Sequence, residues 1–271
     1  MLAVGLDLAW SPRNPSGLAV AEREAGRWRV REARADVVSN EEILAAIDRS
    51  VGRAPAIVAI DAPLVVPYRT RGRDGDRLIT KVFGSHDAGV YPATKRTIGR
   101  YGGRRIWDLR DALVARGYIH DCRIPTGRPG RFFFETYPHA AAVALFHLPK
   151  VLKYKAREGR SLRERMDAFR AYERLLVGLR TFNPPLDAVE PQIDKGMFAL
   201  RGRALKDYED RLDAILCAYV AAYYWTWGTE RCAIFGTLEG GYIVTPFHDG
   251  LATRVPDSTR IITYRSRTAP P

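Results

Sequence analysis

The sequence contains little cysteine and histidine, with three and five residues respectively among 271. Cys122, Cys217 and Cys232 are too few and too scattered for a disulfide framework or a CxxC zinc site. They are typical of a protein in a reducing compartment. None of the histidines has a partner at metal-ligand spacing. The composition therefore excludes disulfide scaffolds and cysteine–histidine zinc proteins.

Long apolar runs and glycine-rich nucleotide motifs are also absent. The apolar N-terminal run meets Asp7 too early for a signal peptide. The most apolar later segment, residues 212–227, contains Asp213 and is too short to span a bilayer. No Walker or GxGxxG motif occurs. We predict a soluble, cytoplasmic protein with no membrane partner.

Positive charge is in excess. The 43 basic and 31 acidic residues give a net charge of +12, which favours a polyanionic partner such as nucleic acid. Residues 68–131 hold fifteen Lys or Arg against six Asp, a net charge of +9. Aromatic residues interleave with these bases, a composition that suits phosphates and stacked bases of DNA or RNA. The alternative is a solvated loop that its aromatic residues fix to the core.

The 68–131 segment is also rich in glycine, and only residues 105–117 have a convincingly helical pattern. We therefore predict that it is an irregular, partly mobile, basic insertion. The chain of 271 residues is long enough for one large domain or two small ones, and its hydrophobic fraction of 46% is sufficient for a core. We predict a single domain over residues 1–250, with the insertion at 68–130 and a C-terminal tail over 251–271 that frays at its Ala-Pro-Pro end.

Asp7 ends an apolar N-terminal strand. Because side chains alternate between the two faces of a strand, Asp7 shares its face with the small residues Ala3 and Gly5. A carboxylate at the end of a buried strand costs free energy unless a cation or hydrogen-bond donors meet it. An aspartate that begins the turn at Ser11-Pro12 is an alternative that this segment alone leaves open.

A second carboxylate follows the same pattern at Asp61. Strands are predicted at 18–22 and 28–34, then a helix that Ser39 caps, then the continuous apolar strand 56–60. A strand, helix and strand in this order predict a parallel crossover. Strand 56–60 should therefore lie parallel to the first strand, and Asp7 and Asp61 should meet at one edge of the sheet.

The rest of the chain supplies further acids. A fifth strand at 132–134 ends in Glu135, and helices are predicted at 138–146, 161–182 and 206–227. Asp210 and Asp213 are three residues apart on the last helix and hence on one face of it. A terminal hairpin could join residues 232–236 and 242–246.

Several carboxylates at one sheet edge repel one another unless divalent cations neutralise them. Ligand sets made only of oxygen suit Mg²⁺ or Mn²⁺. Two such ions about 4 Å apart can clamp a scissile phosphate and activate a water molecule. This chemistry requires no histidine, cysteine or serine nucleophile.

Four motifs carry a resemblance to a known family: Gly5-Leu-Asp7, Ile60-Asp61-Ala-Pro-Leu, Glu135-Thr-Tyr-Pro138 and Asp210-Arg-Leu-Asp213-Ala-Ile-Leu-Cys-Ala-Tyr. Together they resemble the family of domain of unknown function 429, whose members are described as predicted nucleases of the RNase H-like superfamily. The D-x-x-D-A spacing is also similar to the final catalytic helix of RuvC-type resolvases. The resemblance implies an α/β fold of the RNase H-like, RuvC-like type. Its mixed sheet has strand order 3-2-1-4-5 and helices on both faces.

The resemblance also implies site residues. Asp7, Asp61 and Asp213 would form the metal-ligand core, and Asp210 would be a fourth ligand or an orienting group. Glu135 is a further candidate, for which a structural cap or salt bridge is an equal alternative. The resolvases usually have glutamate where this chain has the shorter Asp61, so the metal geometry is open.

The sequence leaves three hypotheses for the function. The first is a Mg²⁺- or Mn²⁺-dependent nuclease that binds DNA or RNA through residues 68–131. The second is a non-catalytic nucleic-acid-binding or scaffold protein of the same fold. The third is an ATP-using enzyme of the actin and sugar-kinase type, which the lack of glycine in 8–11 and 62–64 disfavours.

Overall fold

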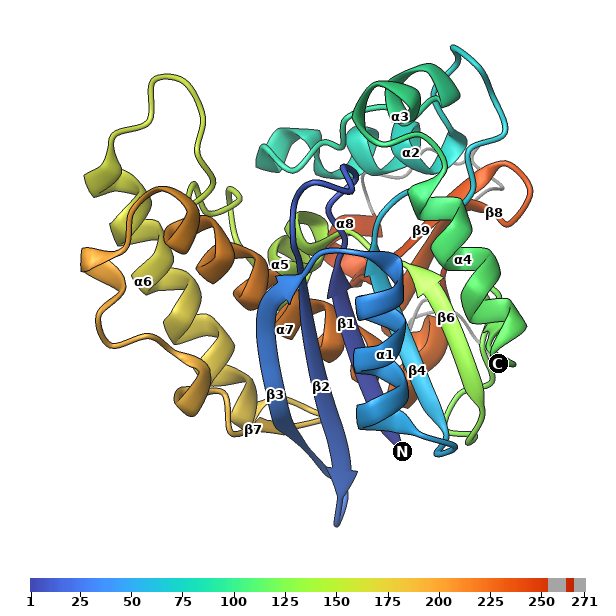
Figure 1. Ribbon diagram of the computed structural model, residues 1–271, viewed down its shortest axis with the longest axis horizontal. Helices are drawn as coiled ribbons and strands as arrows, with labels where there is room; N and C mark the ends of the chain where they lie inside the picture. The colour runs from blue at the N-terminus through green and yellow to red at the C-terminus, as the bar shows by residue number, and fades with distance from the viewer. Residues whose placement is uncertain (253–261, 266–271) are drawn as a thin grey trace.

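A mixed β-sheet forms the centre of the computed structural model, which describes residues 1–252 and 262–265 (Figure 1). Within those residues the sheet has seven strands in the order β5-β6-β4-β1-β2-β3-β7. The strands are β1 Leu2–Asp7, β2 Ser16–Glu24, β3 Arg27–Val37, β4 Ala56–Asp61, β5 Ile119–His120, β6 Arg131–Glu135 and β7 Leu186–Asp187. The first three form an antiparallel meander, and β4 and β6 run parallel to β1.

Helices connect and cover these strands. They are α1 Asn40–Val51, α2 Asp74–Phe83, α3 Lys95–Tyr101, α4 Arg105–Ala115, α5 Pro138–Phe146, α6 Leu162–Gly178, α7 Gly202–Trp227 and α8 Asp249–Ala252. Short 3-10 turns are η1 Gly84–His86, η2 Leu179–Thr181, η3 Glu190–Gln192, η4 Met197–Ala199 and η5 Gly228–Glu230. Ser39 caps α1 and Ser161 caps α6, each in a capping box with a glutamate three residues later. No helix in the described part of the chain is both long and apolar enough to cross a membrane.

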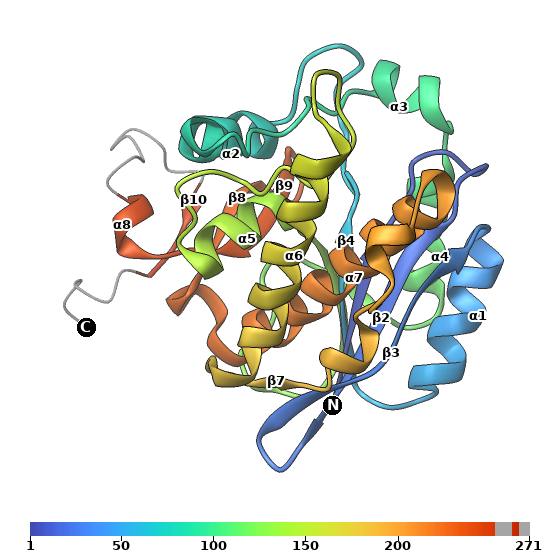
Figure 2. The same cartoon turned by 90° about the vertical axis from the view of Figure 1, so that its left-hand side faces the viewer.

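The alternation of β1 divides the core into two layers. Leu2, Val4 and Leu6 pack with α1 and α4 on one face of the sheet. Ala3 points to the opposite face, where α7 lies with α5 and α6 behind it. Figure 2 shows the two helical layers on either side of the sheet. Helices therefore cover both faces, as expected.

Two glycines allow α7 to lie directly against the sheet. An added Cβ at Gly5 would be 2.0 Å from the Ala214 carbonyl oxygen, and one at Gly17 would be 2.0 Å from the Asp210 carbonyl oxygen. Side chains at these two positions would therefore push the helix away. The close approach brings Asp210 and Asp213 beside the carboxyl end of β1.

The structure confirms the mixed α/β sheet, and the strand order differs from the prediction only in detail. The five long strands follow the predicted order 3-2-1-4-5, with β6 as the fifth strand. The two-residue strands β5 and β7 extend the edges, and their brevity gives no sequence signal. The predicted terminal hairpin is β8 Cys232–Thr237 and β9 Gly241–Pro246.

The C-terminal tail contributes one short strand. Residues 262–263 form β10, Ile262–Thr263, which pairs with β8 and completes a second, three-stranded sheet. The predicted fraying at Ala-Pro-Pro lies outside the described residues.

The prediction of an irregular insertion was wrong in large part. Residues 68–131 contain α2 and α3 besides the expected helix α4, and both views place α2 and α3 beyond the carboxyl ends of β1 and β4 (Figures 1 and 2). Arg73 in this segment is 2% exposed and forms ion pairs with Asp76 at 2.5 Å and with Glu135 at 2.7 Å. Asp76 is a local partner three residues away, but Glu135 lies 62 residues from Arg73, so local periodicity could not reveal the contact that packs this segment against the sheet.

Replacement of Arg73 by methionine is expected to lower the free energy of unfolding by about 4 kcal/mol. The change leaves the buried carboxylates of Asp76 and Glu135 without their cation, and breaking a buried pair typically costs about 3–5 kcal/mol. Urea unfolding measures the change. Arg71→Met is the matched control, because its ion pair with Asp74 is exposed and worth about 1 kcal/mol at most. Equal stability of the two variants would contradict the structural role of Arg73.

A second expected effect concerns acid stability. Burial, with a smaller effect of Arg110, lowers the pKa of His120 from 6.5 to about 4. The unfolded chain therefore takes up this proton at a higher pH than the folded chain, so stability is present above pH 6.5 and is lost as pH falls towards 4. Between pH 7 and 5 the loss should be about 2 kcal/mol. Urea unfolding measures the loss of stability between pH 7 and pH 5, and this loss should be about 2 kcal/mol smaller in His120→Gln than in the wild type. An equal loss in both proteins would contradict the lowered pKa of His120.

Candidate functional site

Asp7 and Asp61 lie side by side at the carboxyl edge of the central sheet. They are partners in the parallel register of β1 and β4, as the sequence predicted. Both are half-buried, and Asp7 Oδ2 has no hydrogen-bond partner among the described residues. Burial raises the pKa of Asp7, although Lys155 opposes the rise. Burial and then the charge of Asp7 raise the pKa of Asp61 well above its ordinary value.

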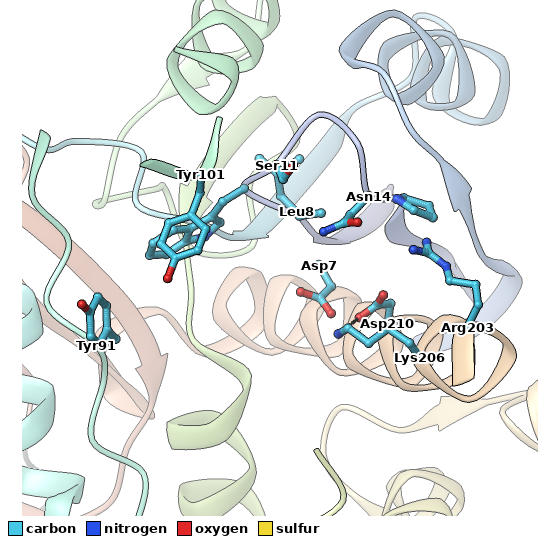
Figure 3. Close-up of a pocket in the computed structure, with 12 residues that line it drawn as sticks. Asp7, Leu8, Ser11, Asn14, Tyr91, Tyr101, Arg203, Lys206 and Asp210 are labelled. Carbon is cyan, nitrogen blue, oxygen red and sulfur yellow. Dashed lines mark hydrogen bonds and ion pairs between the residues drawn. The ribbon is translucent and has the colours of Figure 1, made fainter. Parts of the chain in front are cut away.

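Helix α7 brings Asp210 beside this pair. Asp210 and Asp7 point toward one another in the cavity of Figure 3, and Lys206 lies next to them. Lys206, one turn earlier on α7, forms an ion pair with Asp210 and another with Glu209 at 2.7 Å. Burial and the neighbouring Asp7 raise the pKa of Asp210 to about 8. Asp210 therefore belongs to the same carboxylate cluster as Asp7.

Asp213 is held differently from the other three aspartates. It is fully buried, and its Oδ1 accepts hydrogen bonds from the Tyr154 hydroxyl at 2.7 Å and the Tyr172 hydroxyl at 3.0 Å. Lys155 Nζ lies 2.8 Å from Oδ2. Burial opposes the charged form, but Lys155 and the hydrogen bonds outweigh it and lower the pKa of Asp213. Asp213 is therefore ionised and already has cationic and hydroxyl partners.

Glu135 lies at the same sheet edge in a separate ion network. Arg73 donates to both of its carboxylate oxygens at 2.7 Å, and the Leu64 backbone N–H donates to Oε2 at 2.9 Å. These contacts agree with the salt-bridge alternative that the sequence left open for Glu135.

The carboxylate oxygens of Asp7 and Asp61 are of the ligand type that Mg²⁺ and Mn²⁺ prefer. Among residues 1–252 and 262–265, no group of three or more His, Cys, Asp or Glu is placed so that it could hold a metal ion. Asp210 and Asp213 each have a lysine ammonium as a direct partner, whereas Asp7 and Asp61 have no such ion pair with a described residue. Mg²⁺ in phosphoryl-transfer sites is commonly held by one or two carboxylates, with substrate phosphate and water as further ligands. Asp7 and Asp61 match that arrangement.

Two cavities open on these carboxylates, and a third adjoins the second at Lys155. The first, of about 500 Å³, is lined by Asp7 and Asp210 (Figure 3). The second, of about 260 Å³, is lined by Asp7, Asp61 and Lys155. The third, of about 530 Å³, is lined by Lys155 together with further bases of the segment 151–160. The first and second cavities share Asp7 as a lining residue, and the second and third share Lys155.

The sequence prediction missed Lys155 and Tyr154, which hold Asp213. These residues stand in Lys153-Tyr154-Lys155-Ala156-Arg157, a short run of bases around an aromatic residue. Residues 68–131 have the same mixture of basic and aromatic residues, so composition is a signal that both segments share. Nothing in the local sequence, however, pairs Lys155 with an acid 58 positions later.

Comparison with known proteins identifies the family of the chain. A family model described as protein of unknown function (DUF429) matches residues 5–236. The chain belongs to the DUF429 family. The DUF429 match includes Asp7, Asp61, Asp210 and Asp213, and thus every element that carries the carboxylate cluster. No curated protein and no solved structure matches the chain.

Proposed function

We propose that this protein is a divalent-metal-dependent nuclease of RNase H-like fold that hydrolyses phosphodiester bonds of DNA or RNA. The observation that carries the proposal is the register pairing of Asp7 and Asp61 at the carboxyl edge of the sheet. Asp7 Oδ2 is buried there and has no hydrogen-bond partner in the part of the chain that the structure describes. A buried carboxylate oxygen of this kind is stabilised by a cation. The sheet order and the position of α7 support the RNase H-like assignment.

Asp7 and Asp61 would hold the ion, and Asp210 would orient Asp7. When bound, Mg²⁺ or Mn²⁺ would activate water and stabilise the charge on the scissile phosphate. Lys155 keeps Asp213 ionised and in place, so the buried end of the cluster remains fixed. The surrounding bases would attract the polyanionic substrate towards these carboxylates.

Calorimetric titration of Mn²⁺ tests the site. Wild-type protein is compared with Asp7→Asn/Asp61→Asn, without and with a short phosphorothioate oligonucleotide that supplies phosphate ligands. We expect binding in the wild type and at least about tenfold weaker binding in the variant. The charge-matched control is Asp167→Asn/Glu41→Gln, since both residues are exposed and lie outside the three cavities.

Equal Mn²⁺ binding by the wild type and Asp7→Asn/Asp61→Asn would contradict the metal assignment. Cleavage assays on single-stranded, duplex and branched DNA and RNA then test the reaction. Binding of nucleic acid with no metal-dependent cleavage of any of them would contradict the nuclease proposal and favour the non-catalytic alternative.

A further inference from the structure

The three cavities around the carboxylates adjoin one another. The first and second share Asp7, Leu8, Trp10 and Tyr91 as lining residues. The second and third share Gly89, His139, Lys155 and Arg157. An extended ligand could therefore pass from the first cavity over Asp7 and Asp61 into the third.

The first cavity presents aromatic rings to solvent. Tyr91 is 62% exposed and Tyr101 is 54% exposed. Trp10 packs edge-on against Tyr101 with ring centroids 5.8 Å apart. Exposed rings that line a cavity offer flat apolar faces to a ligand. Stacking of unpaired bases on aromatic side chains is one such contact.

The backbone around these rings is fixed by buried contacts. Arg105 donates hydrogen bonds to the carbonyl oxygens of Ala9 at 2.9 Å and Ser11 at 2.5 Å, which flank Trp10. An added Cβ at Gly102 would be 2.1 Å from the Trp10 carbonyl oxygen, so the chain after Tyr101 lies directly on this loop. Trp10 and Tyr101 are therefore held together before any ligand binds.

The third cavity presents cations. Lys153, Lys155, Arg157 and Arg160 line it, with no acid except Asp87. Lys155 pairs with Asp213, and Lys150 pairs with Asp87. Lys153 and Arg157 are exposed and form no ion pair with a described residue. These two side chains are therefore available to phosphate groups.

We propose that the three cavities form one track for a single-stranded polynucleotide, with bases stacked on Tyr91 and Tyr101 and phosphates bound by Lys153 and Arg157. This inference rests on the proposed nuclease function and names its substrate class. The scissile phosphate would lie between these two ends, next to Asp7 and Asp61. A duplex keeps its bases paired and stacked, so it would leave the tyrosines uncovered.

Fluorescence anisotropy on the Asp7→Asn protein tests the track without cleavage. The probes are a labelled 16-nucleotide single strand, as DNA and as RNA, and a duplex of the same length. We expect the single strand to bind at least about tenfold more tightly than the duplex. Tyr91→Ala/Tyr101→Ala should weaken single-strand binding by about tenfold or more. The control Phe198→Ala removes another exposed aromatic ring, outside the three cavities, and should change nothing.

The basic end is tested by salt dependence. Lys153→Gln/Arg157→Gln should weaken binding and reduce the slope of log K against log salt by about 1.4, the value for two phosphate contacts on a single strand. Arg49→Gln/Arg53→Gln removes the same charge at the opposite edge of the sheet and should leave the slope unchanged. Thermal unfolding confirms that all variants are folded.

The outcomes separate the two proposals. Equal or tighter duplex binding, or tyrosine and basic variants that bind like their controls, would overturn the track even if the wild type cleaves nucleic acid. Single-strand binding with the expected losses supports the track. If the wild type then cleaves no substrate with Mg²⁺ or Mn²⁺, the nuclease proposal fails and the binding track stands.

Discussion

Replacement of Asp7 by asparagine is expected to reduce metal-dependent cleavage by about 10³-fold, because it removes a charge at the centre of the proposed site. The fold should tolerate the change well. Burial raises the pKa of Asp7, so the charged carboxylate is unfavourable in the folded protein without a cation. We therefore expect the thermal unfolding temperature to stay equal or to rise while activity is lost.

Comparison with other aspartates sharpens this prediction. Asp61→Asn should have a similar effect on activity, because Asp61 is the register partner of Asp7. Asp213→Asn should also lower stability, because it removes the charge that pairs with the buried end of Lys155. The exposed control Asp167→Asn should change neither property. An Asp7→Asn protein that retains a tenth or more of wild-type cleavage would overturn the assignment of Asp7 as a ligand.

Gly5→Ala is expected to lower the free energy of unfolding by about 3 kcal/mol, the upper part of the range for overpacking a core. The new methyl group would lie 2.0 Å from the Ala214 carbonyl oxygen and 2.2 Å from the Ala218 backbone nitrogen. Both atoms belong to the backbone of α7, which cannot rotate away as a side chain can. Separation of α7 from β1 would also move Asp210 away from Asp7, so Mn²⁺ binding should weaken together with stability.

The same substitution at Gly99 is the control. Gly99 lies inside α3, and an added Cβ there would meet nothing within 4 Å. Replacement of glycine by alanine in a helix without a clash stabilises by about 0.5–1 kcal/mol. Urea unfolding of the two variants should therefore give changes of opposite sign. Equal changes would show that contact between Gly5 and α7 is not what limits this position.

The sequence by itself determined the long elements and the acids at their ends. The apolar run 56–60 and the alternation of β1 are local patterns, as are the serine caps of α1 and α6. The crossover rule then placed Asp7 and Asp61 at one edge, because a strand–helix–strand unit has a single common topology. The register confirmed that placement.

The tertiary structure alone decided which charges meet. Lys155 and Asp213 are 58 residues apart, and Arg73 and Glu135 are 62 residues apart, so no local periodicity links either pair. A buried ion pair depends on where two segments cross and on whether each charge finds a partner there. The insertion at 68–130 was predicted to be irregular from its glycine content and its weak helical pattern, whereas the distant contacts of Arg73 and Arg105 in fact fix it to the core. Composition determined how much charge the chain carries, and packing determined which of these charges are buried in pairs and which remain available to a ligand.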